Sequence, residues 1–451
     1  MADKLLSVGL DVGTTSTQLI FSELTIENRA GSFSVPEMAI TDRKILYKSP
    51  VRFTPLLDES HVDGTGLRRM IAREYESAGF SREQVDTGAI IITGETSRKE
   101  NAETILRELS GFAGDFVVAT AGPDLESILA AKGAGAVTLS RDSRKTFLHM
   151  DIGGGTSNLA QIDSGEITAT GCLNVGGSLV KYDTQHTVTY VSPVLRGLTD
   201  LAAGQQATPE NLGTIAEFLV QTLEMAAGIR PATPLLAQLT TPGTSVIPPA
   251  EPVTVSFSGG VADCVDTAHP WDEFGDLGPL LGRAIRRSRL CAGPYVLGLE
   301  TIRATVIGAG CYSAQLSGST VFYRNVTFPL KNLPVILPPR EGHLCEYLRR
   351  EYPKREGPAV IALPGPAAPG YAGLQQLAAQ LAKAIPSGPL LICLEQDAAK
   401  ALGQILALTQ PPDRPILCID RVKLTEESYL DIGAPTGPAL PVVVKTLILN
   451  R

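Results

Sequence analysis

The sequence has no excess of positive charge and no long hydrophobic run. Its 39 Lys and Arg residues are outnumbered by 47 Asp and Glu residues, which gives a formal net charge of −8. Nucleic acids and anionic lipid surfaces usually bind clustered positive charge, so we expect neither as a partner. No uncharged apolar stretch reaches the roughly 18–20 residues of a membrane-spanning helix. We therefore expect a soluble protein that is not exported and stays in the cytoplasm.

Cysteine is scarce, and its spacing does not suggest a metal site. The chain has seven cysteines, an odd number, and none of them forms a Cys-X-X-Cys pair. Such pairs are typical of zinc and iron–sulfur sites, so the sequence supports neither. In a reducing cytosol we expect free, buried thiols. The seven are Cys172, Cys264, Cys291, Cys311, Cys345, Cys393 and Cys418.

Low-complexity sequence is also missing. The 44 glycines and 32 prolines make up about 17% of the chain, short of the ~25–30% that is typical of low-complexity proteins. We therefore expect many tight turns and no extended disorder. At roughly 150 residues per domain, the 451 residues predict two or three domains.

Two strand–turn–strand segments follow the same pattern 140 positions apart. In the first, the apolar run 5–12 ends in Asp11-Val12-Gly13-Thr14-Thr15-Ser16 and a second strand-like run follows. In the second, the apolar run 147–152 ends in Asp151-Ile152-Gly153-Gly154-Gly155-Thr156-Ser157, again followed by a strand-like run. The pattern predicts two similar α/β halves, each opening with a β-hairpin whose turn is rich in glycine and hydroxyl groups.

Each of these turns has the composition of a phosphate-binding loop. Glycine lets a polyanion approach the backbone, and the turn exposes N–H groups that strand pairing does not use. Asp11 and Asp151 precede their turns, where a carboxylate can hold a hydrated Mg²⁺ that bridges phosphates. Two such loops that face each other would hold one nucleotide from both sides. The duplicated pattern therefore predicts a nucleotide cleft between two lobes.

Strand and helix signals divide the chain into three parts. We expect a first lobe over 1–145, in which 25–65 is either an insertion or a set of extra strands. A second lobe is expected over 146–320, with a helical region that starts at Gly176-Gly177 and reaches about Gly228. Beyond residue 320, short apolar strands alternate with helices, which indicates a separate C-terminal α/β module over 321–451.

The two turns and three further segments resemble, in order, five motifs of the actin-like ATPase superfamily, which includes actin, heat-shock chaperones, and sugar and acetate kinases. The turns after Asp11 and Asp151 resemble its two phosphate loops. Residues 122–135 resemble its first connecting helix. Residues 256–261 (Ser-Phe-Ser-Gly-Gly-Val) resemble its adenosine motif, and residues 303–310 (Arg-Ala-Thr-Val-Ile-Gly-Ala-Gly) its second connecting helix. The resemblance implies two RNase H-like α/β lobes around an ATP cleft.

The resemblance also implies roles for individual residues. Asp11 and Asp151 would be catalytic and would hold Mg²⁺ through water. A carboxylate of the first connecting helix would orient the attacking water; one alignment favours Asp124 and another Glu126, and we place Glu126 slightly ahead. Small residues would let the two connecting helices cross closely at a hinge. The nucleotide contacts would come from Gly13, Thr14, Thr15, Ser16, Gly153, Gly154, Gly155, Thr156, Gly176, Gly177, Ser258, Gly259, Gly260 and Gly308.

A narrower resemblance rests on three other segments. Residues 92–102 (Ile-Thr-Gly-Glu-Thr-Ser-Arg-Lys-Glu-Asn-Ala), 172–177 (Cys-Leu-Asn-Val-Gly-Gly) and 441–446 (Pro-Val-Val-Val-Lys-Thr) resemble the ethanolamine ammonia-lyase reactivating factors. That family uses ATP and Mg²⁺ to release damaged or adenosyl-less cobalamin from the inactivated lyase, so that intact adenosylcobalamin can replace it. The resemblance implies an ATPase that acts as a chaperone-like exchange factor, with ethanolamine ammonia-lyase as its partner. It also implies association with the microcompartment of ethanolamine utilisation.

Three other functions of the superfamily fit a nucleotide cleft. A small-molecule kinase would also need an acceptor pocket with a general base, which no segment of the sequence identifies. A non-enzymatic actin-like filament protein would not be expected to carry the C-terminal α/β module. An iron–sulfur activase would need the Cys-X-X-Cys ligands that are missing here.

Overall fold

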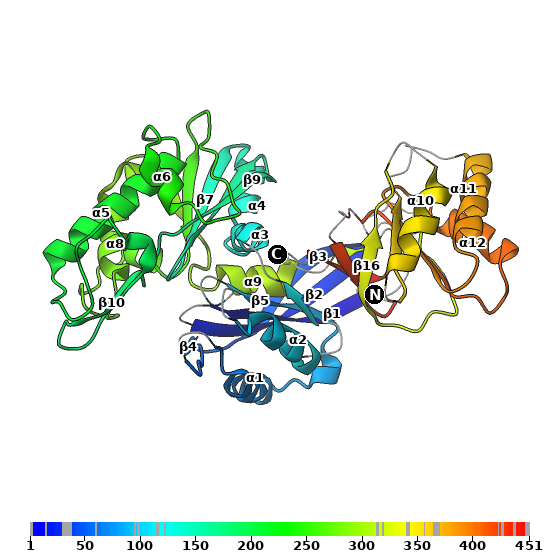
Figure 1. Ribbon diagram of the computed structural model, residues 1–451, viewed down its shortest axis with the longest axis horizontal. Coiled ribbons are helices and arrows are strands. Elements are labelled where there is room, and N and C mark those ends of the chain that lie inside the picture. The colour runs from blue at the N-terminus through cyan, green and yellow to red at the C-terminus, as the bar shows by residue number, and fades with distance from the viewer. Residues whose placement is uncertain are drawn as a thin grey trace.

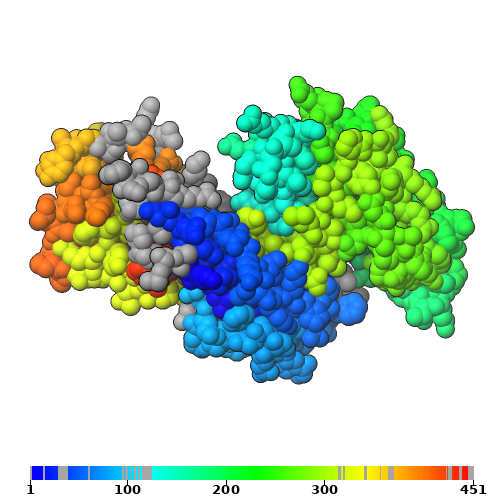
Figure 2. All heavy atoms as spheres, turned by 180° about the vertical axis from the view of Figure 1, so that it is seen from behind, coloured from blue at the N-terminus to red at the C-terminus, as the bar shows by residue number. Residues whose placement is uncertain are grey.

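The computed structural model folds the chain into three bodies, each with its own sheet (Figure 1). The first lobe lies between the second lobe and the C-terminal module, and the view from behind shows the same arrangement (Figure 2). The residues that the structure describes are 3–13, 16–28, 38–58, 61–93, 96, 100–113, 117–120, 123–312, 315–317, 320–339, 343–355, 357–363, 370–422, 424, 428–435 and 439–446.

The first lobe is built on a mixed sheet. Its strands, in spatial order, are β3 (Met38–Lys48), β2 (Ser16–Asn28), β1 (Asp3–Val12), β5 (Thr87–Ile92) and β6 (Val117–Thr120), with the short β4 (Arg52–Phe53) beside β2. The pairs β1–β2 and β2–β3 are antiparallel, whereas β1–β5 and β5–β6 are parallel. Every residue of β5 is buried, as expected of an apolar strand inside a parallel sheet. Helices α1 (Gly64–Ala78) and α2 (Ala102–Ala113) complete this lobe.

Within the region 25–65, strands β3 and β4 are added to this sheet. Strand β3 pairs with β2, and β4 pairs with the start of β2, directly after the first turn. Pro50 and Pro55 lie just outside the strands. A proline there removes no hydrogen bond from the sheet.

The second lobe repeats the sheet of the first. Its strands, in spatial order, are β9 (Glu166–Leu173), β8 (Ser157–Asp163), β7 (Thr146–Ile152), β12 (Thr254–Ser258) and β13 (Tyr295–Leu297). The first two pairs are antiparallel and the last two are parallel, as in the first lobe. The predicted repeat of two RNase H-like halves is therefore confirmed. The helices of this lobe are α5 (Pro209–Ala226), α6 (Pro234–Leu239), α7 (Asp263–Asp266) and α8 (Gly278–Arg287).

The predicted helical region from Gly176 to Gly228 is wrong over its first part. That part forms a hairpin of β10 (Val180–Tyr182) and β11 (Val188–Val191), and helix α5 begins only at Pro209. Valine and tyrosine favour strands, which explains the hairpin. Thr208 marks the true start of the helix, because its hydroxyl accepts a hydrogen bond from the N–H of Asn211.

Two connecting helices cross between the lobes (Figure 1). Helix α3 (Pro123–Gly133) follows the first lobe in sequence but packs on the sheet of the second, whereas α9 (Ala304–Tyr312) follows the second and packs on the first. Helix α4 (Ala136–Ser143) also packs on the second lobe. The two lobes therefore exchange helices, and sequence boundaries at 145 and 320 do not coincide with the division in space.

The C-terminal module is a sheet covered by helices α10 (Leu344–Glu351), α11 (Tyr371–Ala384) and α12 (Ala399–Thr409) on one face. Four neighbouring strands of this sheet, β16 to β19, are parallel, and each connection between them carries one of the helices. The strands, in spatial order, are β14 (Gln315–Leu316), β21 (Pro441–Thr446), β20 (Ser428–Ile432), β16 (Leu330–Ile336), β17 (Val360–Leu363), β18 (Leu390–Leu394), β19 (Ile416–Asp420) and β15 (Phe322–Arg324).

The structure describes all seven cysteines, and its helices can be compared with the length of a membrane span. All seven cysteines are free thiols, and all but Cys345 are buried. No helix in the described ranges has both the length and the apolar character needed to cross a membrane.

Candidate functional site

A cavity of about 600 Å³ lies between the two lobes. This volume is within the ~300–1,000 Å³ that is usual for small-molecule and cofactor sites. Residues from both strand–turn–strand segments and from helix α3 line it. The sequence-predicted residues in its lining are Asp11, Gly13, Ser16, Glu126, Asp151, Gly153, Gly154, Gly155, Thr156, Gly177, Gly259 and Gly260.

Some of the other predicted residues lie behind the cavity wall. Gly176 packs against the second turn, where a Cβ atom would overlap the backbone of Gly154. Gly308 lies in the crossing of the two connecting helices and is not part of the lining. Thr14 and Thr15 fall outside the described residues. The structure therefore gives Gly176 and Gly308 packing roles beside the cavity.

The two turns close in the same way. The N–H of Gly13 donates to the carbonyl of Ser16 at 2.9 Å, and the N–H of Gly153 donates to the carbonyl of Thr156, also at 2.9 Å. The N–H of Gly177 donates to the carbonyl of Gly153 at 3.0 Å, which holds the second turn in place. The two turns, one from each lobe, are thus closed by the same backbone hydrogen bond. Backbone N–H groups in such concave loops are suited to bind anions.

Asp11 and Asp151 lie at the base of the turns, in different surroundings. The Thr93 hydroxyl donates to Asp11 at 2.9 Å, while Asp151 accepts from the hydroxyls of Ser258 and Thr305, the latter at 3.2 Å. Burial raises the pKa of Asp11 to about 7, and the nearby negative charge of Asp151 adds to the effect. Burial also raises the pKa of Asp151. A cation between the two carboxylates would offset both effects.

A buried chain of hydrogen bonds supports Asp151. His149 contacts the hydroxyls of Ser256 and Ser258 at 2.9 Å each, and Ser258 donates to Asp151. Burial lowers the pKa of His149 to about 3, so the ring is neutral. Sequence reasoning placed Ser258 at the nucleotide and missed His149. Alternation along the strands could have revealed it. On β7, His149 lies two positions before Asp151, so both side chains point to the same sheet face. Their partners on β12, Ser256 and Ser258, lie on that face too.

The two candidate carboxylates of helix α3 have different surroundings. Asp124 accepts a hydrogen bond from the Thr170 hydroxyl at 2.7 Å and does not line the cavity. Glu126 does line it. Of the two alternatives left open by the sequence, Glu126 is therefore the carboxylate that faces the cavity.

The predicted adenosine motif lies beside the second turn. Gly259 has a φ of 87°, and its N–H donates to the carbonyl of Thr301 at 3.0 Å. A Cβ atom at this position would overlap the carbonyl of Ile152 at the end of β7. Gly259 is therefore required both by its backbone conformation and by its close approach to β7. Gly260 follows it in the cavity lining.

Sequence reasoning missed two further stretches of the lining. Residues 51–53 contribute from the first lobe, and several residues between 261 and 278 contribute from the second. One of the latter is Asp276, which is held by the N–H of Gly278 at 2.8 Å and by the Ser178 hydroxyl at 3.0 Å. Neither stretch has the glycine-rich pattern of the turns. Only the folding of the two lobes against each other brings them to the cavity.

The donor set at the base of the turns fits Mg²⁺. This ion prefers oxygen ligands, keeps several waters, and is usually held by one or two carboxylates together with phosphates. Asp11 and Asp151 supply two carboxylates, with hydroxyls of Thr93 and Thr305 beside them. Within the described ranges, no three His, Cys, Asp or Glu side chains gather closely enough to hold a metal ion.

Two RNase H-like lobes, exchanged connecting helices and a cavity between paired glycine–hydroxyl turns define a protein of the actin-like ATPase fold. The predicted fold class is thereby confirmed. Within that class the chain belongs to a particular family, that of the ethanolamine utilisation protein EutA, whose model matches residues 3–450.

Two curated relatives match this chain over 98% of its length. The ethanolamine ammonia-lyase reactivase EutA of Salmonella typhimurium is 39% identical over 466 aligned residues, which cover 98% of this chain and 98% of that protein. The protein of the same name from Escherichia coli is 39% identical over 468 residues, with the same coverage. The resemblance to ethanolamine ammonia-lyase reactivating factors is therefore confirmed. Among solved structures, the ethanolamine utilisation protein EutJ from Carboxydothermus hydrogenoformans is 18% identical, over 68% of this chain and 89% of that one, with a TM-score of 0.36.

Proposed function

We propose that this protein reactivates ethanolamine ammonia-lyase. In this proposal it uses ATP and Mg²⁺ to release damaged or adenosyl-less cobalamin from the lyase, so that intact adenosylcobalamin can bind. The observation that carries the proposal is the likeness to two ethanolamine ammonia-lyase reactivases over 98% of the chain, C-terminal module included. The cavity between the lobes supports the nucleotide part. We further propose that the protein works in the cytoplasm, in association with the ethanolamine-utilisation microcompartment.

The proposed nucleotide site uses the residues of the cavity. The backbone N–H groups of the two turns bind the phosphates, and Gly259 and Gly260 let the adenosine lie against the backbone. Asp11 and Asp151 would hold Mg²⁺ through water, and the ion would supply positive charge beside the phosphates. Glu126 orients the water whose oxygen attacks the γ-phosphorus of ATP. The bond between that phosphorus and the β–γ bridging oxygen breaks, this oxygen leaves with ADP, and the water's protons pass to the released phosphate and to solvent.

ATP hydrolysis would affect the lyase by changing the angle between the two lobes. The exchanged helices α3 and α9 are the connections on which the lobes can close over a nucleotide and reopen after hydrolysis. Closure of such a cleft changes the relative position of surfaces on the two lobes. We propose that this change is what the lyase senses.

The test is ATP-dependent recovery of ethanolamine ammonia-lyase activity. The lyase is first blocked with an inactive cobalamin and then incubated with the protein, ATP, Mg²⁺ and free adenosylcobalamin. We expect recovery that needs ATP, that is lost in Asp11→Ala, and that survives Asp42→Ala, the same change at an exposed position of β3. ATP hydrolysis without recovery would contradict the proposal and direct attention to a phosphate acceptor. Nucleotide-dependent polymers that sediment would instead support a filament protein.

A further inference from the structure

The cavity lining carries far more negative than positive charge. Its carboxylates come from both lobes, whereas Arg52 is its one Arg or Lys side chain within the described residues. A nucleotide tail is itself a polyanion. The phosphates therefore need positively charged groups around them in this cavity. Mg²⁺ at Asp11 and Asp151 would supply only part of that positive charge. The carboxylates in the lining are Asp11, Glu126, Asp151, Asp263, Glu273 and Asp276.

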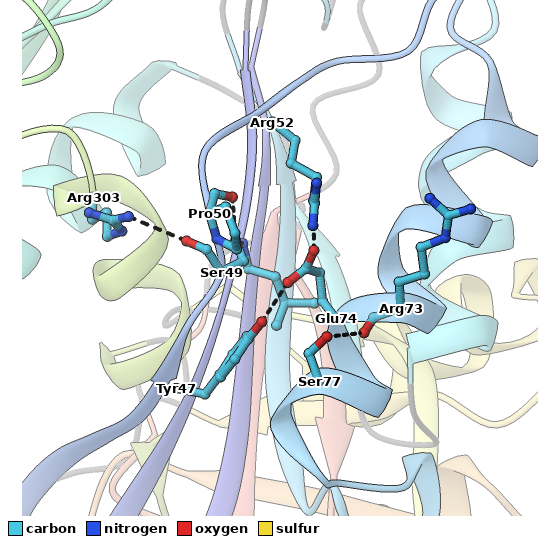
Figure 3. A network of polar contacts seen from close by, with 9 residues as sticks. Tyr47, Ser49, Pro50, Arg52, Arg73, Glu74, Ser77 and Arg303 are labelled. Atoms are coloured by element: carbon cyan, nitrogen blue, oxygen red, sulfur yellow. Dashed lines mark hydrogen bonds and ion pairs between the residues drawn. The ribbon is translucent and has the colours of Figure 1, made fainter.

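Arg52 is fastened to the first turn. It lies on β4, where it pairs with Thr17 immediately after that turn. The Thr54 hydroxyl donates to the carbonyl of Gly13 at 2.7 Å and also contacts the Thr17 hydroxyl at 3.0 Å. At the other end of the segment, Arg303 beside helix α9 donates to the carbonyl of Ser49 at 3.3 Å (Figure 3). The backbone that carries Arg52 is thus held at both ends next to the phosphate loop.

Glu74 holds the Arg52 side chain (Figure 3). Its carboxylate is buried on helix α1 and accepts from Arg52 Nε at 2.7 Å and from the Tyr47 hydroxyl at 2.6 Å. Within the described residues, the Nη1 and Nη2 groups of Arg52 have no hydrogen-bond partner. The Arg52 side chain is 46% exposed. A guanidinium held through Nε keeps its two terminal amino groups for a second, bidentate ligand.

We infer that Arg52 binds the terminal phosphate of the nucleotide and that Glu74 positions it. The inference rests on the proposed function and adds a phosphate ligand to it. The adenosine motif at Gly259 belongs to the second lobe, whereas Arg52 lies on β4 beside the first turn, so the guanidinium meets the phosphate end of the nucleotide. A planar guanidinium there offsets the negative charge of the phosphoryl group that is released.

The experiment compares binding and hydrolysis in five proteins: wild type, Arg52→Met, Glu74→Gln, Arg73→Met and the double variant Arg52→Met/Glu74→Gln. Arg73 neighbours Glu74 on α1, is exposed, and points away from the network in Figure 3, so its variant is the matched control. Calorimetry gives the affinities for ADP and for the non-hydrolysable ATP analogue AMP-PNP, each with Mg²⁺. Steady-state kinetics give kcat and KM for ATP. Thermal unfolding checks the fold of each variant. Arg52→Met leaves the buried Glu74 carboxylate without its ion-pair partner, and the double variant Arg52→Met/Glu74→Gln removes that charge.

We expect Arg52→Met to weaken AMP-PNP binding about tenfold, to leave ADP binding within about threefold, and to lower kcat about 100-fold. Glu74→Gln should raise KM for ATP several-fold with a smaller fall in kcat, since it retains the guanidinium but not its charged partner. Arg73→Met should match the wild type.

A folded Arg52→Met variant, or the double variant, that binds AMP-PNP and hydrolyses ATP as the wild type does would overturn this inference and leave the proposed function intact. A wild-type protein that neither binds nor hydrolyses ATP would overturn both.

Discussion

Asp11 and Asp151 occupy equivalent positions in the two lobes, yet the protein holds them differently. Asp151 accepts from two hydroxyls, and one of these belongs to the buried network that contains His149. Among the described residues, Asp11 accepts from one hydroxyl, that of Thr93. Each hydrogen bond to a carboxylate stabilises its charged form. Asp11 therefore has fewer hydroxyl donors to oppose the effect of burial, and its pKa of about 7 lies near physiological pH.

The raised pKa of Asp11 predicts a pH-dependent stability. Between the ordinary Asp value of 3.8 and about 7, folded Asp11 keeps a proton that the unfolded chain has lost. Its contribution to the free energy of unfolding therefore falls as the pH rises through this window. Asp11→Asn cannot titrate, so the stability of the variant relative to wild type should increase between about pH 4.5 and about pH 7.5. Urea denaturation at both pH values, without Mg²⁺ or nucleotide, measures this difference; a difference that does not change with pH would contradict the prediction.

A single hydrogen bond also distinguishes Asp124 from Glu126, the two candidates for the carboxylate that orients water. Both carboxylates lie in the first turn of α3, two positions apart, and the sequence pattern fits either. The Thr170 hydroxyl comes from β9 of the second lobe and binds Asp124. Such a contact between distant segments cannot be read from a local motif, which is why the sequence left the question open.

At the scale of elements, the crossing of α3 and α9 depends on residues without side chains. A Cβ atom at Gly133 would overlap the carbonyl of Ala304, and one at Gly308 would overlap the carbonyl of Leu129. The two helix backbones are thus in direct contact. Because each helix packs on the lobe that it does not follow in sequence, this contact connects the two lobes.

Gly308→Ala should therefore destabilise the protein by about 1–3 kcal/mol, because the added methyl group forces the helices apart. The matched control is Gly213→Ala in the interior of α5, where nothing lies within 4 Å of the added Cβ atom. That change should stabilise the protein by about 0.5–1 kcal/mol, since alanine is the better helix former. Chemical denaturation of both variants measures the two effects. Equal effects of the same sign at the two sites would show that the helix crossing is not tight.

At the scale of the molecule, the end of the chain packs on its beginning. Val443 of β21 is buried in one apolar cluster with Leu5 of β1 and with Leu24 and Ile26 of β2. Figure 1 shows the same junction, with β16 and its sheet beside the first lobe. This cluster attaches the C-terminal module to the lobe that carries the first turn. The module would therefore move with the first lobe when the cleft closes.

Val443→Asp should weaken this junction. A carboxylate in the cluster loses its hydration without gaining a partner, and we expect a loss of about 3–5 kcal/mol. Calorimetry should then resolve separate unfolding transitions for the module and the lobes. Leu408→Asp is the control, because Leu408 on α12 of the same module is 85% exposed. A single transition with unchanged midpoint in Val443→Asp would show that the cluster does not couple the two bodies.

Local sequence determined the paired turns, the apolar strands that lead into them, the adenosine motif and the alternation of strands and helices beyond residue 320. Each of these features follows from residues that are close together in the sequence. Apolar runs form buried strands, and glycine permits the backbone conformations of tight turns. The prediction from local pattern failed at the hairpin of β10 and β11. It extended a helix from Gly176-Gly177 through valine and tyrosine residues that favour strands.

The tertiary structure alone decided the exchange of α3 and α9 between the lobes, the position of Glu126 and not Asp124 in the cavity lining, and the presence of Arg52 and Asp276 there. These features depend on contacts between residues tens to hundreds of positions apart. No sequence motif records such contacts, because they form only when the sheets pack against one another.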